Sequence, residues 1–469
     1  MATTRTTRPR QVLLLTAAAV FMAYLDLTIV NVAFPAIQED FQGASLATLS
    51  WVLNGYATVF AALLIPAGRL GDRFGRRRAF LAGLLVFTAA SGLCALATTP
   101  EVLIAARVVQ AVGAALLIPS SLGLLLPEFP PGQRATTVAK WGAVGGIAVA
   151  AGPSLGGLLV QQAGWRWAFL INLPIGLAVA LAGRRVLTER RDPNGGRPDA
   201  LGAALLTGAI GALTLAIVKV PEWGWQRGQP LGWFAVALLA LAVYRSRRHP
   251  TPVLDTSLLR VRAFAVASAA TLVFNLGLSA LFLGTVLFLT SVWGYSVLGA
   301  GLALSAGPLA SAVVAVPAAR LAGRVGPGLV AAGGSLLFAA GTASFILSLS
   351  AEPRYGGRLL PGLLASGVGL GMTIPVLAGA AVATLPAERL ATGTAVVTMA
   401  RQVGGILGVA ILVAVLGTPD AADVGAAFDR AWAVMAAAGL ASALLSLTLG
   451  RASGGRQVTR DLATTGAPI

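Results

Sequence analysis

Stretches of about twenty apolar residues recur along the whole chain and limit the folds that it can adopt. A helix of roughly 20 apolar residues crosses the hydrocarbon core of a bilayer, and backbone groups in lipid must be hydrogen-bonded within their own segment. The runs lack the alternation of polar and apolar residues that marks barrel strands. Hydrophobic residues make up 57% of the 469 positions and charged residues 11%. We therefore expect an all-α integral membrane protein.

Fourteen such runs follow one another, with no segment of soluble-domain length between them. The eighth is the shortest and the least secure. The first is longer than the core of a signal peptide, which favours an uncleaved first span. The predicted spans lie near residues 11–34, 46–67, 79–97, 102–125, 138–160, 167–183, 200–218, 231–244, 264–289, 298–319, 328–349, 359–384, 391–416 and 430–449.

The positive charges are distributed unevenly over the connections between these spans. If the first residue is cytoplasmic, that side holds 26 of the 34 Lys and Arg residues, the other side holds six, and Arg107 and Arg401 fall inside spans. Cytoplasmic loops carry such an excess, so we expect both termini on the cytoplasmic side of a bacterial inner membrane. The loop arginines would contact anionic lipids. Because they are scattered over short loops, we expect no nucleic-acid partner.

The residues of enzymes and metal sites are scarce in this chain. Cys94 is the only cysteine, and His249 is the only histidine. A disulfide framework and a thiolate metal cluster are therefore excluded, and no phosphate-binding loop of the Walker type occurs. We expect neither an enzyme nor a resident metal or cofactor.

One ten-residue motif occurs twice. PAGRLGDRFG at 66–75 and PAARLAGRVG at 317–326 are identical at six positions, and each follows the second helix of a possible six-helix half. Two related halves in the same orientation imply a parallel repeat about the membrane normal. The predicted division is 1–183 for the first half, 184–262 for a linker with two additional helices, 263–450 for the second half and 451–469 for a cytoplasmic tail.

Two spans carry stripes of small residues. Ala148, Gly152 and Gly156 recur at four-residue spacing in the fifth span, and Gly404 and Gly408 do so in the thirteenth. This spacing allows two helices to approach closely in a membrane. Ordinary helix packing explains it as well as a specific contact does.

Ionisable groups are rare inside the spans, and three of them lie deep: Asp26, Arg107 and Arg401. Each costs roughly 2.5–3.5 kcal/mol at the bilayer centre. At about 1.5 Å per residue, Asp26 and Arg107 reach the same depth from opposite sides. Burial raises the pKa of a carboxyl group, and a nearby arginine lowers it. A carboxylate under both influences can bind and release a proton as its exposure to water changes. A fixed structural salt bridge is the alternative.

Several motifs together resemble a known family. RLGDRFGRRR at 69–78, with Gly68, resembles the loop signature of the major facilitator superfamily. LDLTIVNVAFP at 25–35, RVVQAVGAA at 107–115, AGPSLGG at 151–157, WRWAFLINLPIG at 165–176 and RQVGGILGVA at 401–410 resemble its fourteen-span drug:proton antiporters, the EmrB/QacA-like group. The resemblance implies a major facilitator fold with two six-helix halves plus two additional helices. It also implies export of lipophilic compounds, driven by inward proton flow.

The resemblance assigns roles to particular residues. Asp26 and Arg107, on spans that line the central cavity, would couple protons to transport. The latch that holds the halves together on the cytoplasmic side would comprise Gly68, Asp72, Arg73, Gly75 and Arg76. Contact between helices would involve Gly152, Pro153, Gly156 and Gly157. Candidates for lining a substrate cavity are Asn31, Trp51, Asn54, Tyr56, Gln110, Asn172, Phe274, Asn275 and Arg401.

The sequence departs from the family pattern at a few positions. Ala111 and Thr398 stand where glycine and asparagine are usual, and Gly323 replaces the aspartate of the second loop. The last change leaves the cytoplasmic latch one-sided.

We therefore expect a monomeric, proton-coupled multidrug exporter that works by alternating access. Asp26 is the only acid expected deep in a span, which favours neutral or monocationic lipophilic substrates. A dedicated exporter of one metabolite, lipid or antibiotic and a membrane sensor that does not transport remain alternatives.

Overall fold

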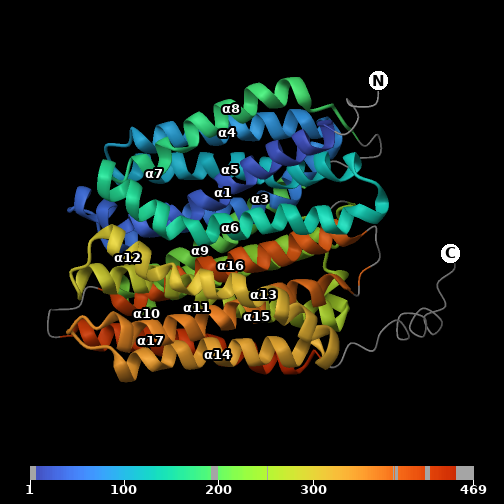
Figure 1. The fold of residues 1–469 in the computed structure, drawn as a ribbon. Helices are drawn as coiled ribbons and strands as arrows, with labels where there is room; N and C mark the ends of the chain where they lie inside the picture. The colour runs from blue at the N-terminus through green and yellow to red at the C-terminus, as the bar shows by residue number, and fades with distance from the viewer. Residues whose placement is uncertain are drawn as a thin grey trace.

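The described residues form a bundle of long helices without strands (Figure 1). The computed structural model describes residues 7–191, 199–250, 252–383, 385, 389–417 and 423–449. The predicted tail at 451–469 lies outside them. Thirteen helical segments within the described residues are long and apolar enough to cross a membrane. The chain is a multi-pass membrane protein.

The first half of the chain crosses the bundle six times. Its helices are α1 (Thr7–Asp40), α2 (Leu46–Leu49) continued by α3 (Trp51–Phe74), α4 (Arg76–Ala95), α5 (Pro100–Leu125), α6 (Pro131–Ala163), and α7 (Trp167–Leu170) continued by α8 (Asn172–Val186).

Two further helices and a second set of six crossings follow. The two are α9 (Ala200–Val218) and α10 (Val220–Ser246). The second set comprises α11 (Arg262–Ser291), α12 (Val297–Leu304) continued by α13 (Ala306–Val325), α14 (Pro327–Ser348), α15 (Leu360–Ala383), α16 (Leu390–Leu416) and α17 (Val424–Leu447). Short connections contain the segments η1 (Leu126–Glu128), η2 (Leu258–Arg260) and η3 (Tyr355–Leu359).

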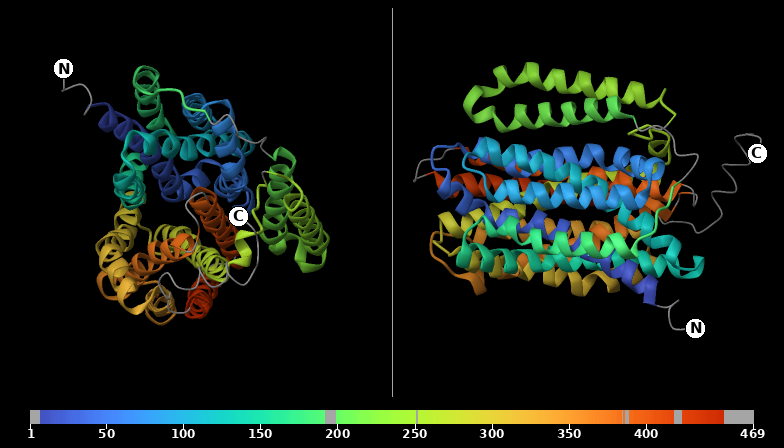
Figure 2. Two further views of the ribbon diagram at one scale, coloured as in Figure 1. Left: turned by 90° about the vertical axis from the view of Figure 1, so that its right-hand side faces the viewer. Right: turned by 90° about the horizontal axis from the view of Figure 1, so that it is seen from above.

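The predicted eighth span, at 231–244, lies within α10, which runs from Val220 to Ser246 and is longer than predicted. Helix α10 is not among the thirteen candidate spans. Its first turns are rich in polar residues and glycine, which lowers its hydropathy, and Gly224 interrupts the helical backbone with φ 72°. α10 nevertheless packs along the whole of α9 (Figure 2). Several other helices also extend past their apolar windows, because a helix continues into the aqueous interface.

The repeated motif adopts the same structure at both of its positions. Helix α3 ends at Phe74 and α4 starts at Arg76, and Gly75 between them has φ 118°. Helix α13 ends at Val325 and α14 starts at Pro327, and Gly326 has φ 101°. This backbone region favours glycine because it lacks a β-carbon. The two copies of the motif therefore form the same turn between consecutive helices.

Glycines set the closest helix crossings within each half. A β-carbon on Gly152 of α6 would overlap the Thr28 side chain of α1. In the second half, β-carbons on Gly404 and Gly408 of α16 would overlap the carbonyl oxygens of Leu272 and Leu276 on α11. Lipid competes equally for apolar side chains, so close backbone packing contributes much of the association of such helices.

We predict that Gly408→Ala destabilises the protein and that Gly379→Ala does not. The added methyl at 408 must push α16 away from α11, whereas a β-carbon at Gly379 of α15 meets no atom within 4 Å. Overpacking costs about 1–3 kcal/mol, and Gly→Ala in an open helix position gains up to about 1 kcal/mol. Thermal unfolding in detergent measures both. Equal melting temperatures of the two variants would contradict the close crossing.

Candidate functional site

A cluster of buried polar side chains lies inside the first half, among α1, α3, α4, α5 and α8. Its centre is Asp26 of α1 and Arg107 of α5, each only 1% exposed. Sequence depth alone had placed these two residues at one level of the bilayer, and the structure brings them into direct contact. The Arg107 Nη1 lies 2.5 Å from the Asp26 Oδ2.

The Asp26 carboxylate receives hydrogen bonds from three side chains on two helices, α5 and α8. Besides Arg107, the Gln110 Nε2 donates to its Oδ1 at 2.9 Å and the Asn172 Nδ2 donates to the same oxygen at 3.0 Å. Ser91 of α4 joins the network by accepting from both amides, at 2.8 and 3.2 Å. All the hydrogen-bond partners of the carboxylate among the described residues are donors, and such an environment suits an ionised acid.

The Arg107 side chain makes further hydrogen bonds and also contacts two aromatic rings. It donates to the Gln110 Oε1 at 2.5 Å and to the carbonyl oxygen of Val52 at 3.1 Å. Its guanidinium carbon lies 4.1 Å from the ring centre of Tyr56 and 5.7 Å from that of Phe169. Cation–π contact of this kind is strongest where water is excluded. The planar guanidinium thus satisfies an acid, an amide, a carbonyl and two aromatic faces at once.

Other predicted cavity residues lie outside this cluster. Asn31 and Asn275 donate to the carbonyl oxygens of Leu27 and Thr271 on their own helices. Phe274 is fully buried, and its ring centre lies 4.8 Å from that of Phe338 on α14, which places it in the packing of the second half. Trp51 is half-buried at the start of α3.

Of the other predicted residues, Arg401 lies at the boundary between the halves and Asn54 is buried in α3. Arg401 of α16 donates to the Tyr24 hydroxyl of α1 at 3.3 Å. Asn54 of α3 is buried, and neither end of its amide has a hydrogen-bond partner within the described residues. A buried amide without a partner is costly, so Asn54 offers free hydrogen-bonding capacity to a ligand.

The small-residue motif of α6 contacts other helices on two of its faces. Gly152 and Gly156 pack on Thr28 and Ile29 of α1, inside the same half. The neighbouring face contacts α12 across the boundary: Gly157 meets the backbone of Leu298, and the Ser154 and Ser305 hydroxyls lie 2.6 Å apart. One helix therefore connects its own half to the other half.

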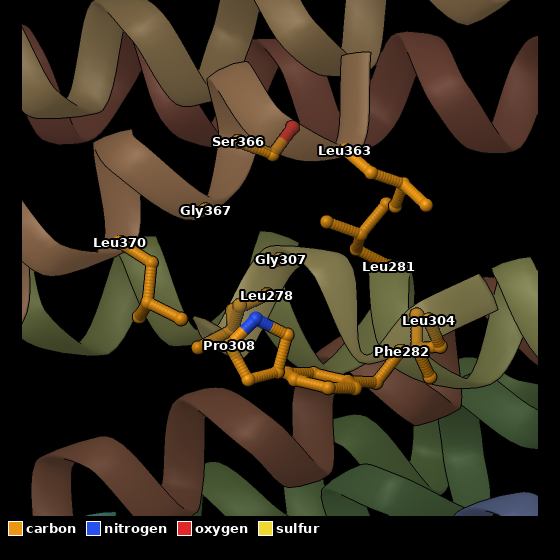
Figure 3. A pocket seen from close by; sticks show the side chains of 10 residues that line it. All are labelled: Leu278, Leu281, Phe282, Leu304, Gly307, Pro308, Leu363, Ser366, Gly367 and Leu370. Atoms are coloured by element: carbon orange, nitrogen blue, oxygen red, sulfur yellow. The ribbon is translucent and has the colours of Figure 1, made fainter. Parts of the chain in front are cut away.

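An apolar pocket lies in the second half, between α11, α13 and α15 (Figure 3). Ser366 of α15 is its one side chain with a polar group, and that hydroxyl has no partner among the described residues. Leu281 and Leu278 of α11 lie opposite Leu363 and Gly367 of α15. The cavity measures about 20 Å³, which is room for about one water molecule, so it is too small for a lipophilic substrate in this state.

Comparison with known proteins places these features in a family. Residues 16–409 match the family model of the Major Facilitator Superfamily. The chain belongs to this superfamily. It is 37% identical over 438 residues to the tetracenomycin C resistance and export protein of Streptomyces glaucescens, which covers 91% of this chain and 78% of that one.

Further relatives of this superfamily member carry similar descriptions. The probable actinorhodin transporter of Streptomyces coelicolor is 35% identical over 90% of this chain and 75% of its own length. The methylenomycin A resistance protein of the same organism is 35% identical over 88% and 87%. Among solved structures, an auto-inhibited POT family peptide transporter superposes with a TM-score of 0.67 at 16% identity over 98% of both chains, which shows the fold alone.

The predicted latch loop of this major facilitator protein forms hydrogen bonds with other residues of the first half. Asp72 accepts from the Arg76 Nε at 2.8 Å, and Arg76 also donates to the carbonyl oxygen of Gly123 at the end of α5. The hydrogen bonds and ion pairs given for Asp72 within the described residues all join it to Arg76. Arg73 lies near the ring of Phe74, and Gly68 packs on Pro119 of α5.

Sequence reasoning missed several residues of these sites. Ser91 lies in an apolar run with no pattern around it, so only the fold could place it beside Asn172 and Gln110. Glu189 lies in the predicted linker, and its carboxylate accepts from the backbone N–H of Arg77 at 3.1 Å and sits against Gly75. Helix N-termini favour negative charge, but the first turn of α4 has no acid of its own, so no local pattern indicated this contact.

We predict that the pair Asp26 and Arg107 shows strong coupling in a double-mutant cycle. Arg107→Met alone leaves a buried carboxylate without its counter-ion and costs about 3–5 kcal/mol, whereas Asp26→Asn added to it relieves much of that loss. Thermal unfolding in detergent measures all four variants. The matched control is the pair Asp40 and Arg166, whose side chains are each 42% exposed and where we expect about 0–1 kcal/mol. Additive losses at Asp26 and Arg107 would contradict the dry ion pair.

Proposed function

We propose that this protein is a proton-coupled exporter of lipophilic compounds, of the fourteen-span antiporter type, and that Asp26 carries the proton. The observation on which the proposal rests is the dry ion pair between Asp26 and Arg107, buried among five helices. An ionisable group in a membrane interior is costly and marks a functional site by default. Export is supported by the relatives whose names describe resistance and export.

The geometry suggests how the pair would work. In the state described here, the carboxylate faces donors only, so a proton can bind only after Arg107 or the amides move away. Rocking of the two halves would open the cluster to water on one side, and protonated Asp26 would then release Arg107. The freed guanidinium remains stacked on Tyr56 and bonded to Val52. Binding of proton and of substrate would therefore alternate.

The cytoplasmic loop would set the balance between the two states. Asp72 and Arg76 make a compact turn against α5, at the end of the helix whose Ile65 shares a cluster with Val396 and Val397 of α16. We propose that Asp72 acts as the latch when the inner side is closed. The arginines of this surface contact anionic lipid in a bacterial inner membrane, with both termini in the cytoplasm, and the protein works as a monomer.

Asp26→Asn is expected to abolish gradient-driven export and to leave membrane insertion intact. An amide keeps the size of the side chain but cannot take up a proton. Dye efflux from everted vesicles, with and without a protonophore, measures the coupling, and downhill dye exchange shows that the variant still binds its substrate.

Asp40→Asn is the matched control. It neutralises an acid at the outer end of the same helix and should export at the wild-type rate. Uphill transport by Asp26→Asn at the wild-type rate would assign proton coupling to another group.

Substrate charge follows from the single interior acid. Exchange of one proton for a monocation is electroneutral, and export of a neutral compound moves one charge inward, which gains about 2.3 kcal/mol per 100 mV. A dication would move one charge against the potential and would face Arg107. We therefore expect efflux of neutral and monocationic dyes and poor efflux of a bis-quaternary compound of equal hydrophobicity. The comparison is made with the potential and the pH gradient dissipated separately, and equal export of the dication would show a coupling ratio above one.

A dedicated exporter of one antibiotic is the second candidate. It is favoured because three relatives are named for a single compound, namely tetracenomycin C, actinorhodin and methylenomycin A. A resistance profile in a host without its own efflux pumps separates broad from narrow export.

A further inference from the structure

The positive charge of Arg401 is not neutralised by any acid of the described residues. Arg401 lies eleven residues after the start of α16 at Leu390, which places it about 16 Å along the helix and close to the middle of a bilayer. The ion pairs among the described residues join other basic side chains to acids, and none of them includes Arg401. Charged groups at this depth are costly, and they usually pair with one another or line a water-filled cavity.

The deep acid Asp26 does not serve as the counter-ion of Arg401. Asp26 is already paired with Arg107, and it lies two residues after Tyr24, the residue that Arg401 contacts. At about 100° of rotation per residue, Tyr24 and Asp26 point to nearly opposite faces of α1. Asp26 faces α5 and α8, whereas Tyr24 faces α16 and the α6 backbone at Gly145. Two deep arginines thus share one deep acid within the described bundle.

The contact between Arg401 and Tyr24 offers hydrogen-bond donors to a ligand. Arg401 donates to the Tyr24 hydroxyl oxygen at 3.3 Å, and its guanidinium carbon lies 5.8 Å from the centre of the ring. A guanidinium has five N–H donors, and this is the one hydrogen bond that Arg401 makes with the described residues. The Tyr24 hydroxyl hydrogen also finds no acceptor among them. Both side chains are partly exposed, so a ligand can reach these donors.

A site built only of donors is complementary to an anion, because the oxygens of an anion only accept hydrogen bonds. Tyr24 belongs to the first half of the chain and Arg401 to the second. An anion bound to both residues would hold α1 and α16 together. Rocking that separates these helices would break its contact with one of the two donors. Such a ligand therefore binds the two states with different affinities, as a transported substrate must.

The depth of the site selects the kind of anion. The phosphate of a lipid headgroup stays at the surface of a hydrocarbon core of roughly 30 Å, and a small inorganic ion would have to give up its hydration to reach the middle of that core. An organic acid with apolar rings avoids both difficulties. Its rings can pack against the Tyr24 ring, which itself packs on apolar clusters of the core, and its carboxylate can bind the planar guanidinium through two parallel hydrogen bonds.

We propose that the protein also exports lipophilic organic acids in their ionised form, and that Arg401 is their counter-ion, with the Tyr24 hydroxyl as a second donor. This inference rests on the proposed export function and extends its substrate range to monoanions. Exchange of one inward proton for one outward monoanion moves two charges, both in the direction that the membrane potential favours.

The test compares two dyes built on one fluorescent ring system, one with a carboxylate and one with the corresponding primary amide. Their initial rates of uptake into everted vesicles are measured for the wild-type protein and for Arg401→Gln, and uptake by vesicles without the protein is subtracted. A loss of stability lowers both rates, whereas loss of the counter-ion lowers the ratio of the carboxylate rate to the amide rate. Arg354→Gln is the matched control, because the Arg354 side chain is 65% exposed in a connection between helices.

We expect the ratio to fall about tenfold or more in Arg401→Gln, since a hydrogen-bonded charge pair is lost, and to stay at the wild-type value in Arg354→Gln. No uptake of the carboxylate dye by the wild-type protein, or an unchanged ratio in Arg401→Gln, overturns the inference while uptake of the amide dye leaves the export function standing. Absence of gradient-driven uptake of any dye by the wild-type protein overturns the proposed function instead.

A second pair of variants keeps Arg401 and gives it an internal counter-ion. Thr398 lies three residues before Arg401 on α16, and its hydroxyl donates to the Thr394 carbonyl oxygen at 2.9 Å. A glutamate at 398 would form an ion pair with Arg401 at i,i+3 spacing and compete with the carboxylate dye, whereas a glutamine of the same size would not. We expect a lower ratio in Thr398→Glu than in Thr398→Gln. Equal ratios in these two variants overturn the inference even where Arg401→Gln fails to fold.

Discussion

Close approach of helix backbones is the constraint on which this structure depends. In lipid, apolar side chains gain little by leaving the bilayer for a neighbouring helix, so packing and interhelical hydrogen bonds have to supply the association. The crossings of α1 with α6 and of α11 with α16 both use glycines, where an added methyl group would collide with the neighbouring helix. The same type of contact joins the halves at Gly157 and Gly301. Close contacts at glycines thus stabilise each half and also join the two halves.

The buried cluster is placed by that packing. Asp26 lies two residues before Thr28 on α1, and Thr28 packs against Gly152 of α6. The crossing of α1 and α6 therefore fixes the position of the acid. Arg107 and Gln110 follow each other by one turn of α5 and so reach the same carboxylate. Ser91 and Asn172 complete the network from α4 and α8. A change in the tilt of any of these helices would alter the hydrogen bonds of the acid.

Much of the fold and part of the site could be predicted from the sequence. Apolar runs predicted the helices, and the repeated motif predicted two halves whose turns at Gly75 and Gly326 have the same backbone form. Depth counting from the span ends predicted that Asp26 and Arg107 share one level. Contacts between side chains on different helices, such as Ser91 with Gln110, depend on helix rotation, which hydropathy does not encode. The eighth span was predicted too short, because the first turns of α10 are polar and hydropathy marks only its apolar end.

The hairpin of α9 and α10 adds an even number of crossings to the chain. Two added crossings return the chain to the side from which it left, so both copies of the repeat keep one orientation, and Ile65 can share a cluster with Ala318 and Val330 at the same end of the bundle. An insertion of one or three helices would invert the second copy and send its arginine-bearing turn to the opposite leaflet. The linker between the halves can therefore gain or lose helices only in pairs.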